Sequence, residues 1–502
     1  MLVLLTNLYP QIDTTISQAF KEAQPRRRNY FKAKYPSYSL LAGYLLVTEA
    51  NRGDPFAEHE LGLRYLVGQG FAADTVKAVY WIRKAVDKNL PAARFNYGIL
   101  LYNGIGVPWN PFEAFNNFKI ASNSGLPEAQ FAYGILMTDN LTVNRDYGGA
   151  YKLFKSAAKA GYQPAKEVIE QMKKSGFIPP SDSSVTNDVR ADETAQLINQ
   201  QWDLDFYDFE NTTKAKDSVV SINKILSKSS SELKKYFGID EGTENTKLPD
   251  TTGIGILKFA AENGSPEAIL LIGKSYETGE NFQKSLIAAA SNYLRAYRLG
   301  SYKAGNSLLR LIQQNEFVNE LKARANKKDP EAMYVFAGMT ALGFANLLTN
   351  EQALDLLKDA VVKKHIPSMI ELGICYSAGT LVNKNLNEAI KYWQQAKDLG
   401  SREAEIRIAF AILADSTNLA DKSEQIKILQ KSGDEGSVLA QTLLGLCYEK
   451  GLGIKENKRT AVMYYRIASQ RGNETAFNSL KRMYDDLRPA DDEYKIYETE
   501  QN

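Results

Sequence analysis

Histidine and cysteine are nearly absent from this sequence, since 502 residues contain only two of each. So few ligands exclude a zinc scaffold or an iron–sulfur protein, and two cysteines exclude a small domain held together by disulfides. A serine or cysteine nucleophile normally needs a histidine as its base, so nucleophilic catalysis is disfavoured as well. The composition therefore predicts a protein that is not an enzyme and that holds no metal or cofactor.

The sequence also lacks a large net charge and a long apolar run. Lys and Arg number 61 and Asp and Glu number 59, so no chain-wide field attracts nucleic acid or an anionic membrane. No apolar run reaches the roughly eighteen residues that span a bilayer. The start, Met1–Leu5, is briefly apolar and has no basic leader, which predicts a cytoplasmic protein. If this start is the end of a trimmed signal peptide, the protein is instead periplasmic or secreted.

The clearest pattern in the sequence is a repeat of 36 residues. A small residue recurs at this interval, at Gly62, Gly98 and Gly134 and again at Gly373, Ala409 and Gly445. Around this residue, apolar side chains recur at steps of three and four, which predicts the first helix of a unit. A second helix is predicted by side chains that can cap a helix start. These recur in register at Asp74, Asn110, Asp146, Ser285, Thr349, Asn385, Asp421 and Asn457.

The repeats fall into two blocks. Residues 55–171 carry three units, and residues 253–488 carry six units with caps. Residues 1–54 are expected to form capping helices, 172–252 a partly helical connector, and 489–502 a polar tail. The predicted fold is all-α, a superhelical α/α solenoid of about nine helix-turn-helix units.

One unit shows the pattern most clearly. It contains Ala57, Leu61-Gly62, Tyr65, Gly68-Gln69-Gly70, Asp74, Lys77-Ala78, Trp81 and Lys84-Ala85, and the unit from Ala440 to Ala468 is similar. The pattern resembles the Sel1-like repeat family, a branch of the tetratricopeptide-repeat superfamily. Two units depart from it: the third has Asn140 and Thr142 in place of the Gly-x-Gly turn, and the unit at 302–329 is short. The resemblance implies an α/α superhelix that binds other macromolecules and carries no catalytic residues.

The resemblance also implies which side chains face a partner. The first helix of each unit would line the concave face at positions three before, one after and four after the recurring small residue. The candidate partner-binding residues are His59, Leu63, Phe95, Ile99, Tyr102, Phe131, Ile135 and Phe410. Most are aromatic or apolar, which is the composition of an interface core. One alternative stays open: the connector 172–252, through its acidic and aromatic stretch Trp202–Phe209, fills this groove as internal packing.

The expected function is that of a non-enzymatic scaffold or adaptor that binds a protein or peptide through its concave face. A stacked solenoid supplies the extended surface that such binding uses. The alternative is a carbohydrate- or cell-wall-binding accessory protein of an export or envelope assembly, which would take a polysaccharide as its partner. Nucleic acid is not an expected partner. The sequence leaves the identity of the partner open.

Overall fold

The computed structural model describes residues 43–174, 222–239, 252–344, 347–415, 421–471 and 473–496. Throughout these ranges the regular structure is helical, and no strand occurs there beyond an isolated bridge between Ser301 and Asn473. The all-α prediction is therefore confirmed. No helix in the described ranges is long and apolar enough to cross a membrane. The stretch Trp202–Phe209 and the predicted capping segment before residue 43 lie outside the described residues.

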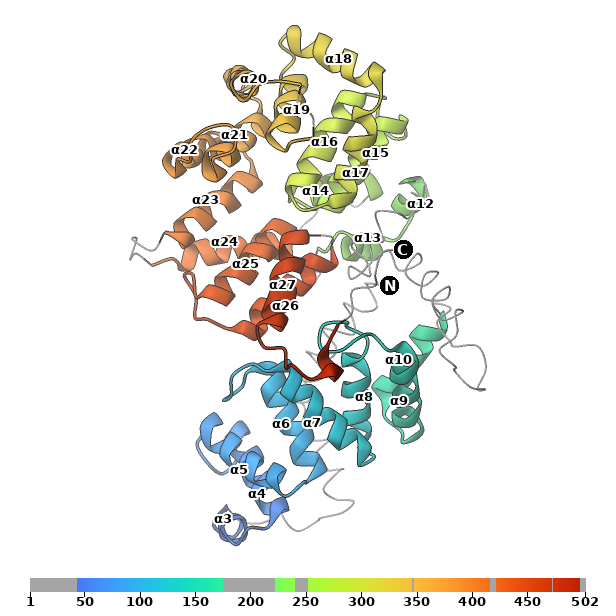
Figure 1. Cartoon of the computed structure of the whole chain (residues 1–502), viewed down its shortest axis with the longest axis vertical. Helices are drawn as coiled ribbons and strands as arrows, with labels where there is room; N and C mark the ends of the chain where they lie inside the picture. Colours follow the sequence, from blue (N-terminus) through green and yellow to red (C-terminus); the bar gives the residue numbers. More distant parts are fainter. Residues whose placement is uncertain are drawn as a thin grey trace. The chain divides into compact units, whose positions relative to one another are not determined.

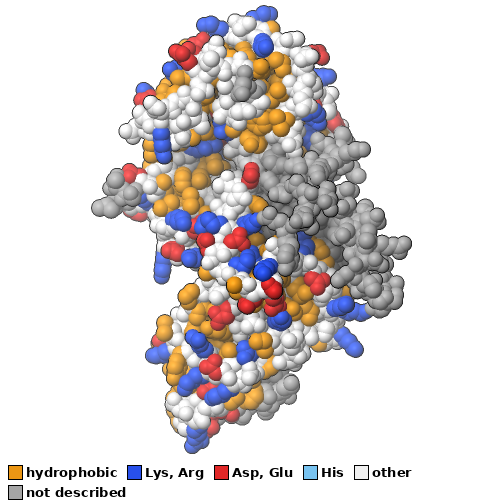
Figure 2. Space-filling view, viewed as in Figure 1, with side chains coloured by type: hydrophobic (Ala, Val, Ile, Leu, Met, Phe, Trp, Pro, Cys, Tyr) orange, Lys and Arg blue, Asp and Glu red, His pale blue; other side chains and the backbone are white. Residues whose placement is uncertain are grey.

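The chain divides into two compact units, which are described separately. The first comprises Met1–Asp203 and Leu480–Asn502, and the second comprises Leu204–Ser479. This division differs from the predicted block boundary at residue 488, because residues from Leu480 onward pack with the first three repeats. Figure 2 shows basic and acidic side chains interspersed on the viewed face, with apolar side chains between them.

The first unit contains three helix pairs with a helix on either side. Its helices are α3 (Gly43–Asn51), α4 (Pro55–Val67), α5 (Thr75–Asp87), α6 (Pro91–Asn103), α7 (Pro111–Asn123), α8 (Pro127–Leu136), α9 (Tyr147–Lys159) and α10 (Gln163–Lys174). The C-terminal half of α27 (Glu474–Asp485) and a short 3-10 turn, Asp492–Tyr494, complete it.

The second unit contains six helix pairs that follow one another along an arc (Figure 1). In the described residues before them lie three short helices: α12 (Ile222–Leu226), α13 (Ser230–Tyr236) and α14 (Gly253–Glu262). The first three pairs are α15 (Pro266–Thr278) with α16 (Leu286–Arg298), α17 (Tyr302–Ile312) with α18 (Asn315–Asn326), and α19 (Pro330–Ala341) with α20 (Asn350–Val362). The last three are α21 (Ile366–Ala378) with α22 (Leu386–Asp398), α23 (Arg402–Ala414) with α24 (Ser423–Asp434), and α25 (Val438–Lys450) with α26 (Lys458–Gln470).

The recurring small residue lets the two helices of a pair approach closely. A Cβ added at Gly98 in α6 would lie 2.7 Å from the Phe118 ring in α7, and one at Gly445 would lie 2.6 Å from the Tyr465 ring. These distances are too short for a methyl group, so the second helix could place its aromatic side chain there only against glycine. The glycine therefore recurs because the aromatic ring of the second helix packs directly against the first helix at this position.

The caps predicted from the sequence begin the second helices. Asn385 Oδ1 accepts a hydrogen bond from the Glu388 amide at 3.2 Å, and Thr349 with Gln352 forms a complete capping box. Asp421 is the exception among the eight. The helix α24 begins one residue later than its register predicts, so that Lys422 occupies the cap and Asp421 bonds to Ser423. The prediction was therefore wrong by one residue at that site.

Arg471 closes the arc of the second unit. Its guanidinium donates to Glu267 at the start of α15 at 2.8 Å, and to the carbonyl oxygens of Phe237 at 2.9 Å and Gly436 at 3.0 Å. The Arg471 side chain is almost fully buried, so these bonds exchange little with solvent. The sixth pair of this unit thus contacts the first, and the inner side of the arc is closely surrounded by helices.

Candidate functional site

The eight side chains predicted to face a partner are all buried or half-buried. His59, Leu63, Ile99, Tyr102, Phe131 and Ile135 are buried, whereas Phe95 and Phe410 are half-buried. His59 Nε2 lies 2.7 Å from Asn96 Nδ2 of the next repeat. Seven of the eight lie in the first unit, and Phe410 packs in a separate cluster of the second unit.

Two aromatic members of this set each pack against an aromatic ring of their own repeat. The Phe95 ring lies 5.7 Å from the Phe118 ring, and the Phe131 ring lies 5.7 Å from the Phe154 ring, centroid to centroid. Polar replacements at these positions would therefore lower the stability of the first unit, whether or not a partner binds there.

The first unit holds a segment of the chain itself, residues 486–496, which we call the C-terminal strap; it contains the 3-10 turn Asp492–Tyr494. Arg488 anchors it, because Nη2 donates to the Leu141 carbonyl at 2.9 Å and Nη1 donates to the Thr142 carbonyl at 3.3 Å. The same guanidinium lies 5.2 Å from the centroid of the Phe112 ring. The carbonyls belong to the loop in which the third repeat lacks its Gly-x-Gly turn.

Aromatic contacts hold the two ends of the strap. Before it, Tyr484 packs edge-on against Trp109 at 5.3 Å, and within it Tyr494 packs against Phe112 at 5.4 Å. Asn144 donates to the Lys495 carbonyl at 2.8 Å. These contacts fall on α7, on the loop that precedes α7 and on the loop that follows α8. The repeat surface thus holds an irregular segment of chain through main-chain and aromatic contacts.

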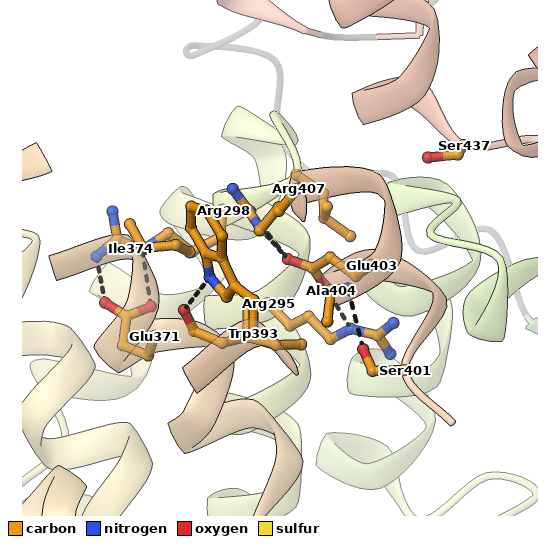
Figure 3. Close-up of polar contacts among 12 residues, drawn as sticks. Arg295, Arg298, Glu371, Ile374, Trp393, Ser401, Glu403, Ala404, Arg407 and Ser437 are labelled. Atoms are coloured by element: carbon orange, nitrogen blue, oxygen red, sulfur yellow. Dashed lines mark hydrogen bonds and ion pairs between the residues drawn. The ribbon is translucent and has the colours of Figure 1, made fainter. Parts of the chain in front are cut away.

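In the second unit, charged side chains from α16, α21 and α23 meet (Figure 3). Arg298 donates to both oxygens of Glu371, and the Nε–Oε2 distance is 3.0 Å. Arg407 Nη2 donates to Glu403 Oε1 at 2.9 Å, and Arg295 Nε lies 3.5 Å from Glu403 Oε2. The carboxylates of Glu371 and Glu403 are 1% and 4% exposed. Buried charges of this kind are stable only when paired, and here each carboxylate has a guanidinium partner.

A pocket opens beside this charged cluster. It has room for about one water molecule, and it is lined by Arg295, Arg298, Tyr334, Pro367, Ile370, Glu371, Ile374 and Glu403. Ile370 and Ile374 lie three before and one after Gly373, which are positions that the repeat register predicts on the concave face. Ile374 is half-buried, so the pocket wall reaches solvent on that side. The pocket combines an apolar wall with guanidinium and hydroxyl groups.

Burial shifts the pKa of both cysteines and of one of the two histidines. Burial raises the pKa of the Cys375 thiol to about 11 and that of the Cys447 thiol to about 12, so both stay protonated and unreactive at neutral pH. Burial lowers the pKa of His365 to about 4, so its imidazole is neutral. In the part of the chain that the structure describes, no three His, Cys, Asp or Glu side chains are placed to hold a metal ion.

The sequence analysis missed the residues of this pocket. Arg298 and Glu371 are 73 residues apart and lie on either side of the shortened unit 302–329. Their pairing depends on how α16 and α21 pack, which repeat periodicity does not specify. The one available signal was the shortened unit itself, because it changes the register of all later helices.

The model of the Sel1 repeat family matches residues 55–90, 91–126, 127–162, 266–301, 366–401 and 438–473. The first three matched segments are the helix pairs of the first unit, and the others are the pairs α15–α16, α21–α22 and α25–α26. The pairs α17–α18, α19–α20 and α23–α24 share the helix-turn-helix plan outside the matched segments.

Curated relatives match parts of the chain. It is 25% identical over 255 residues to the chitin synthase regulator SKT5 of Saccharomyces cerevisiae, covering 47% of this chain and 37% of that protein. It is 32% identical over 108 residues to the DAP3-binding cell death enhancer 1 of Mus musculus, covering 22% of this chain and 21% of that protein. The chain therefore spans less than two-fifths of the length of these relatives.

Solved structures of repeat proteins are also similar. A protective antigen of uropathogenic Escherichia coli with an SLR fold is 19% identical, with 90% of this chain and 91% of that chain covered and a TM-score of 0.31. A Sel1 repeat protein from Oxalobacter formigenes is 30% identical, with 25% and 95% covered and a TM-score of 0.24. Each of the six matched segments folds as the helix pair that its sequence predicts, so the chain contains six Sel1 repeats, a repeat of the tetratricopeptide-repeat-like superfamily.

Proposed function

We propose that this chain is a non-enzymatic scaffold that binds a protein or peptide partner through the concave face of its second unit. Sel1 repeat proteins generally mediate protein–protein interaction. The observation that carries the proposal is the pocket beside Ile370 and Ile374, because it combines an apolar wall with polar groups on the face that the register assigns to partners.

The C-terminal strap supports the same proposal from the first unit. There an irregular segment is held by hydrogen bonds from Arg488 to main-chain carbonyls and by the ring of Tyr494. A partner peptide can use the same kinds of contact on another repeat surface. The name of the yeast relative describes a regulator of an enzyme, which fits a protein that acts through contacts with other proteins. It gives no support to a polysaccharide partner for this chain.

Site-specific photo-crosslinking tests the proposal. A benzoylphenylalanine at Ile374, in the pocket wall, should give a discrete protein adduct in lysate of the native organism after irradiation. The matched control places the same group at Val362 of α20, which is 82% exposed on a different helix. Adducts of the same size from both positions, or none from Ile374, would contradict binding through this face.

A further inference from the structure

The C-terminal strap shows how a second helix of the repeats holds a segment of chain. The Tyr494 ring packs against Phe112 at 5.4 Å and against Phe115 at 6.0 Å, centroid to centroid, so the apolar side chains of α7 hold it. Glu493, the residue before it, forms an ion pair with Lys119, which lies two turns after Phe112 on the same helix. The group that α7 holds is therefore an acidic side chain followed by an aromatic ring.

The preceding repeat has side chains of related chemistry at the same positions, 36 residues earlier on α5. The equivalents of the three α7 residues that contact the strap are, in order, Val76, Val79 and Arg83. Burial raises the pKa of Tyr133 in α8, and the charge of Lys119 opposes this shift. Burial likewise raises the pKa of Tyr97 in α6, and there the charge of Arg83 opposes it. The basic side chain thus lies near the equivalent tyrosine in both repeats.

On α5 these positions are open to solvent. Val76 is 72% exposed, and Tyr80, one turn later, is 53% exposed. The Tyr80 ring packs edge-on against Trp81 at 5.1 Å, and the Lys84 ammonium lies 5.1 Å from its centroid, so the ring is held in place at the surface. A single exposed apolar side chain needs no explanation. These two coincide with the part of the repeat that is covered by the strap on α7.

Arg83 supplies the charged group of this surface. Its side chain is exposed and forms no ion pair with any residue in the described ranges. The acidic Asp87 and Glu113 also lie near Tyr97, so the surface has no large excess of positive charge. An ion pair with Arg83 would therefore add little affinity, and it would set which sequence fits beside the apolar side chains.

We propose that α5 binds a segment of a protein partner in which an acidic residue precedes an aromatic residue. The surface that binds it, which we call the α5 face, consists of Val76, Val79, Tyr80 and Arg83. The aromatic ring packs on the apolar side chains, and the carboxylate pairs with the guanidinium. The α5 face lies in the first unit, so this inference goes beyond the function proposed for the second unit.

Two contacts of the strap have no counterpart on the α5 face. Trp109, which packs against the residue Tyr484 before the strap, is replaced by Ala73. Asn144, which donates to a carbonyl of the strap, is replaced by Pro108. Binding of a separate segment therefore depends on the acidic and aromatic pair itself, which makes the two residues of that pair the ones to vary.

The probe is a fluorescein-labelled peptide with the sequence of residues 487–496, added to the full chain, in which the strap already covers α7. Fluorescence anisotropy should show saturable binding between micromolar and millimolar protein concentration. Tyr494→Ala in the peptide should abolish binding, and Glu493→Lys should weaken it about tenfold. The proposal fails if the peptide does not bind saturably, or if both altered peptides bind as tightly as the original.

A charge exchange locates the binding site. Arg83→Glu in the full chain should weaken binding of the original peptide about tenfold and should recover binding of the peptide with Glu493→Lys. Because Arg83 is exposed, its replacement should leave the melting temperature unchanged. Lys358→Glu, at an exposed lysine of α20, is the matched control and should change neither affinity.

The exchange also separates the α5 face from the strap site on α7. A peptide that displaced the strap from α7 would bind Arg83→Glu as tightly as the wild type, and that result would overturn the proposal. Loss of binding without recovery by the exchanged peptide would overturn it as well. Crosslinking from Ile374 probes the second unit, so its outcome tests the scaffold function independently of the α5 face.

Discussion

His365 should make the stability of the second unit depend on pH. It begins α21, with its Nδ1 2.8 Å from Ser368 Oγ and its ring 5.7 Å from the Tyr334 ring. Burial lowers its pKa from 6.5 to about 4, although the negative charge of Asp329 acts in the opposite direction. The folded protein therefore keeps this imidazole neutral under conditions in which an exposed histidine becomes charged.

The direction of the effect follows from proton uptake. The unfolded chain binds a proton at His365 near pH 6.5, whereas the folded chain binds it only near pH 4. The stability associated with the neutral ring is complete above about pH 6.5 and is lost as the pH falls toward 4. At about 1.4 kcal/mol per pH unit, the difference between the two pKa values corresponds to about 3 kcal/mol. Since the ring is only half-buried, this figure is an upper bound.

His365→Asn removes the imidazole and keeps a side chain that is favoured at a helix start. Urea denaturation at pH 7 and pH 4.5 measures the free energy of unfolding. Between these two pH values, this free energy should fall by about 2 kcal/mol more in the wild type than in the variant. The chain has only two histidines, so the Cε1 resonance that the variant lacks identifies His365 and gives its pKa directly. Parallel stability curves, or a resonance that titrates between pH 6 and 7, would refute the reasoning.

Three other changes probe the repeats and the strap. Asn385→Ala and Asn457→Ala should each lower the free energy of unfolding by about 1 kcal/mol, because each Oδ1 accepts an amide hydrogen bond at a helix start. Glycine at either position should lower it by only about a few tenths of a kcal/mol. Urea denaturation measures these changes, and alanine variants as stable as the wild type would contradict the prediction. Gly98→Ala should cost about 1–3 kcal/mol through its clash with Phe118, whereas Gly148→Ala, whose nearest neighbour is at 3.6 Å, should not lower the melting temperature. Arg488→Met should speed amide exchange in the strap about tenfold, because it removes its bonds to Leu141 and Thr142. Arg52→Met, at an exposed arginine that pairs with Glu49, is its control, and equal exchange in both variants would argue against the anchoring role of Arg488.

The repeat units were predictable because their signals are local. A cap such as Asn110 acts on the amide of Glu113, three residues away, and Gly98 acts on Phe118 in the adjoining helix. Both features return at the same spacing in other units, so chance matches are easily rejected. Among the eight predicted caps in the described residues, the register failed at α24, which begins one residue later than predicted.

The strap was not predictable, because its contacts connect opposite ends of the sequence. Arg488 and Leu141 are 347 residues apart, and no local pattern relates them. The polar composition of residues 489–502 suggested a solvated tail, whereas the Tyr494 ring is buried against Phe112. The candidate groove of the first unit could be listed by register, but its burial depends on packing that the register does not describe.

The two departures from the repeat pattern coincide with the two surfaces that the structure distinguishes. The third unit lacks its Gly-x-Gly turn, and its replacement loop offers the carbonyls that receive Arg488. The unit at 302–329 is short, and across it α16 contacts α19, so that Arg298 reaches Glu371 beside the pocket. Regular positions in a solenoid maintain packing between neighbours. A position that breaks the pattern while its neighbours keep it must satisfy some other contact, and in this chain such positions locate the strap and the pocket.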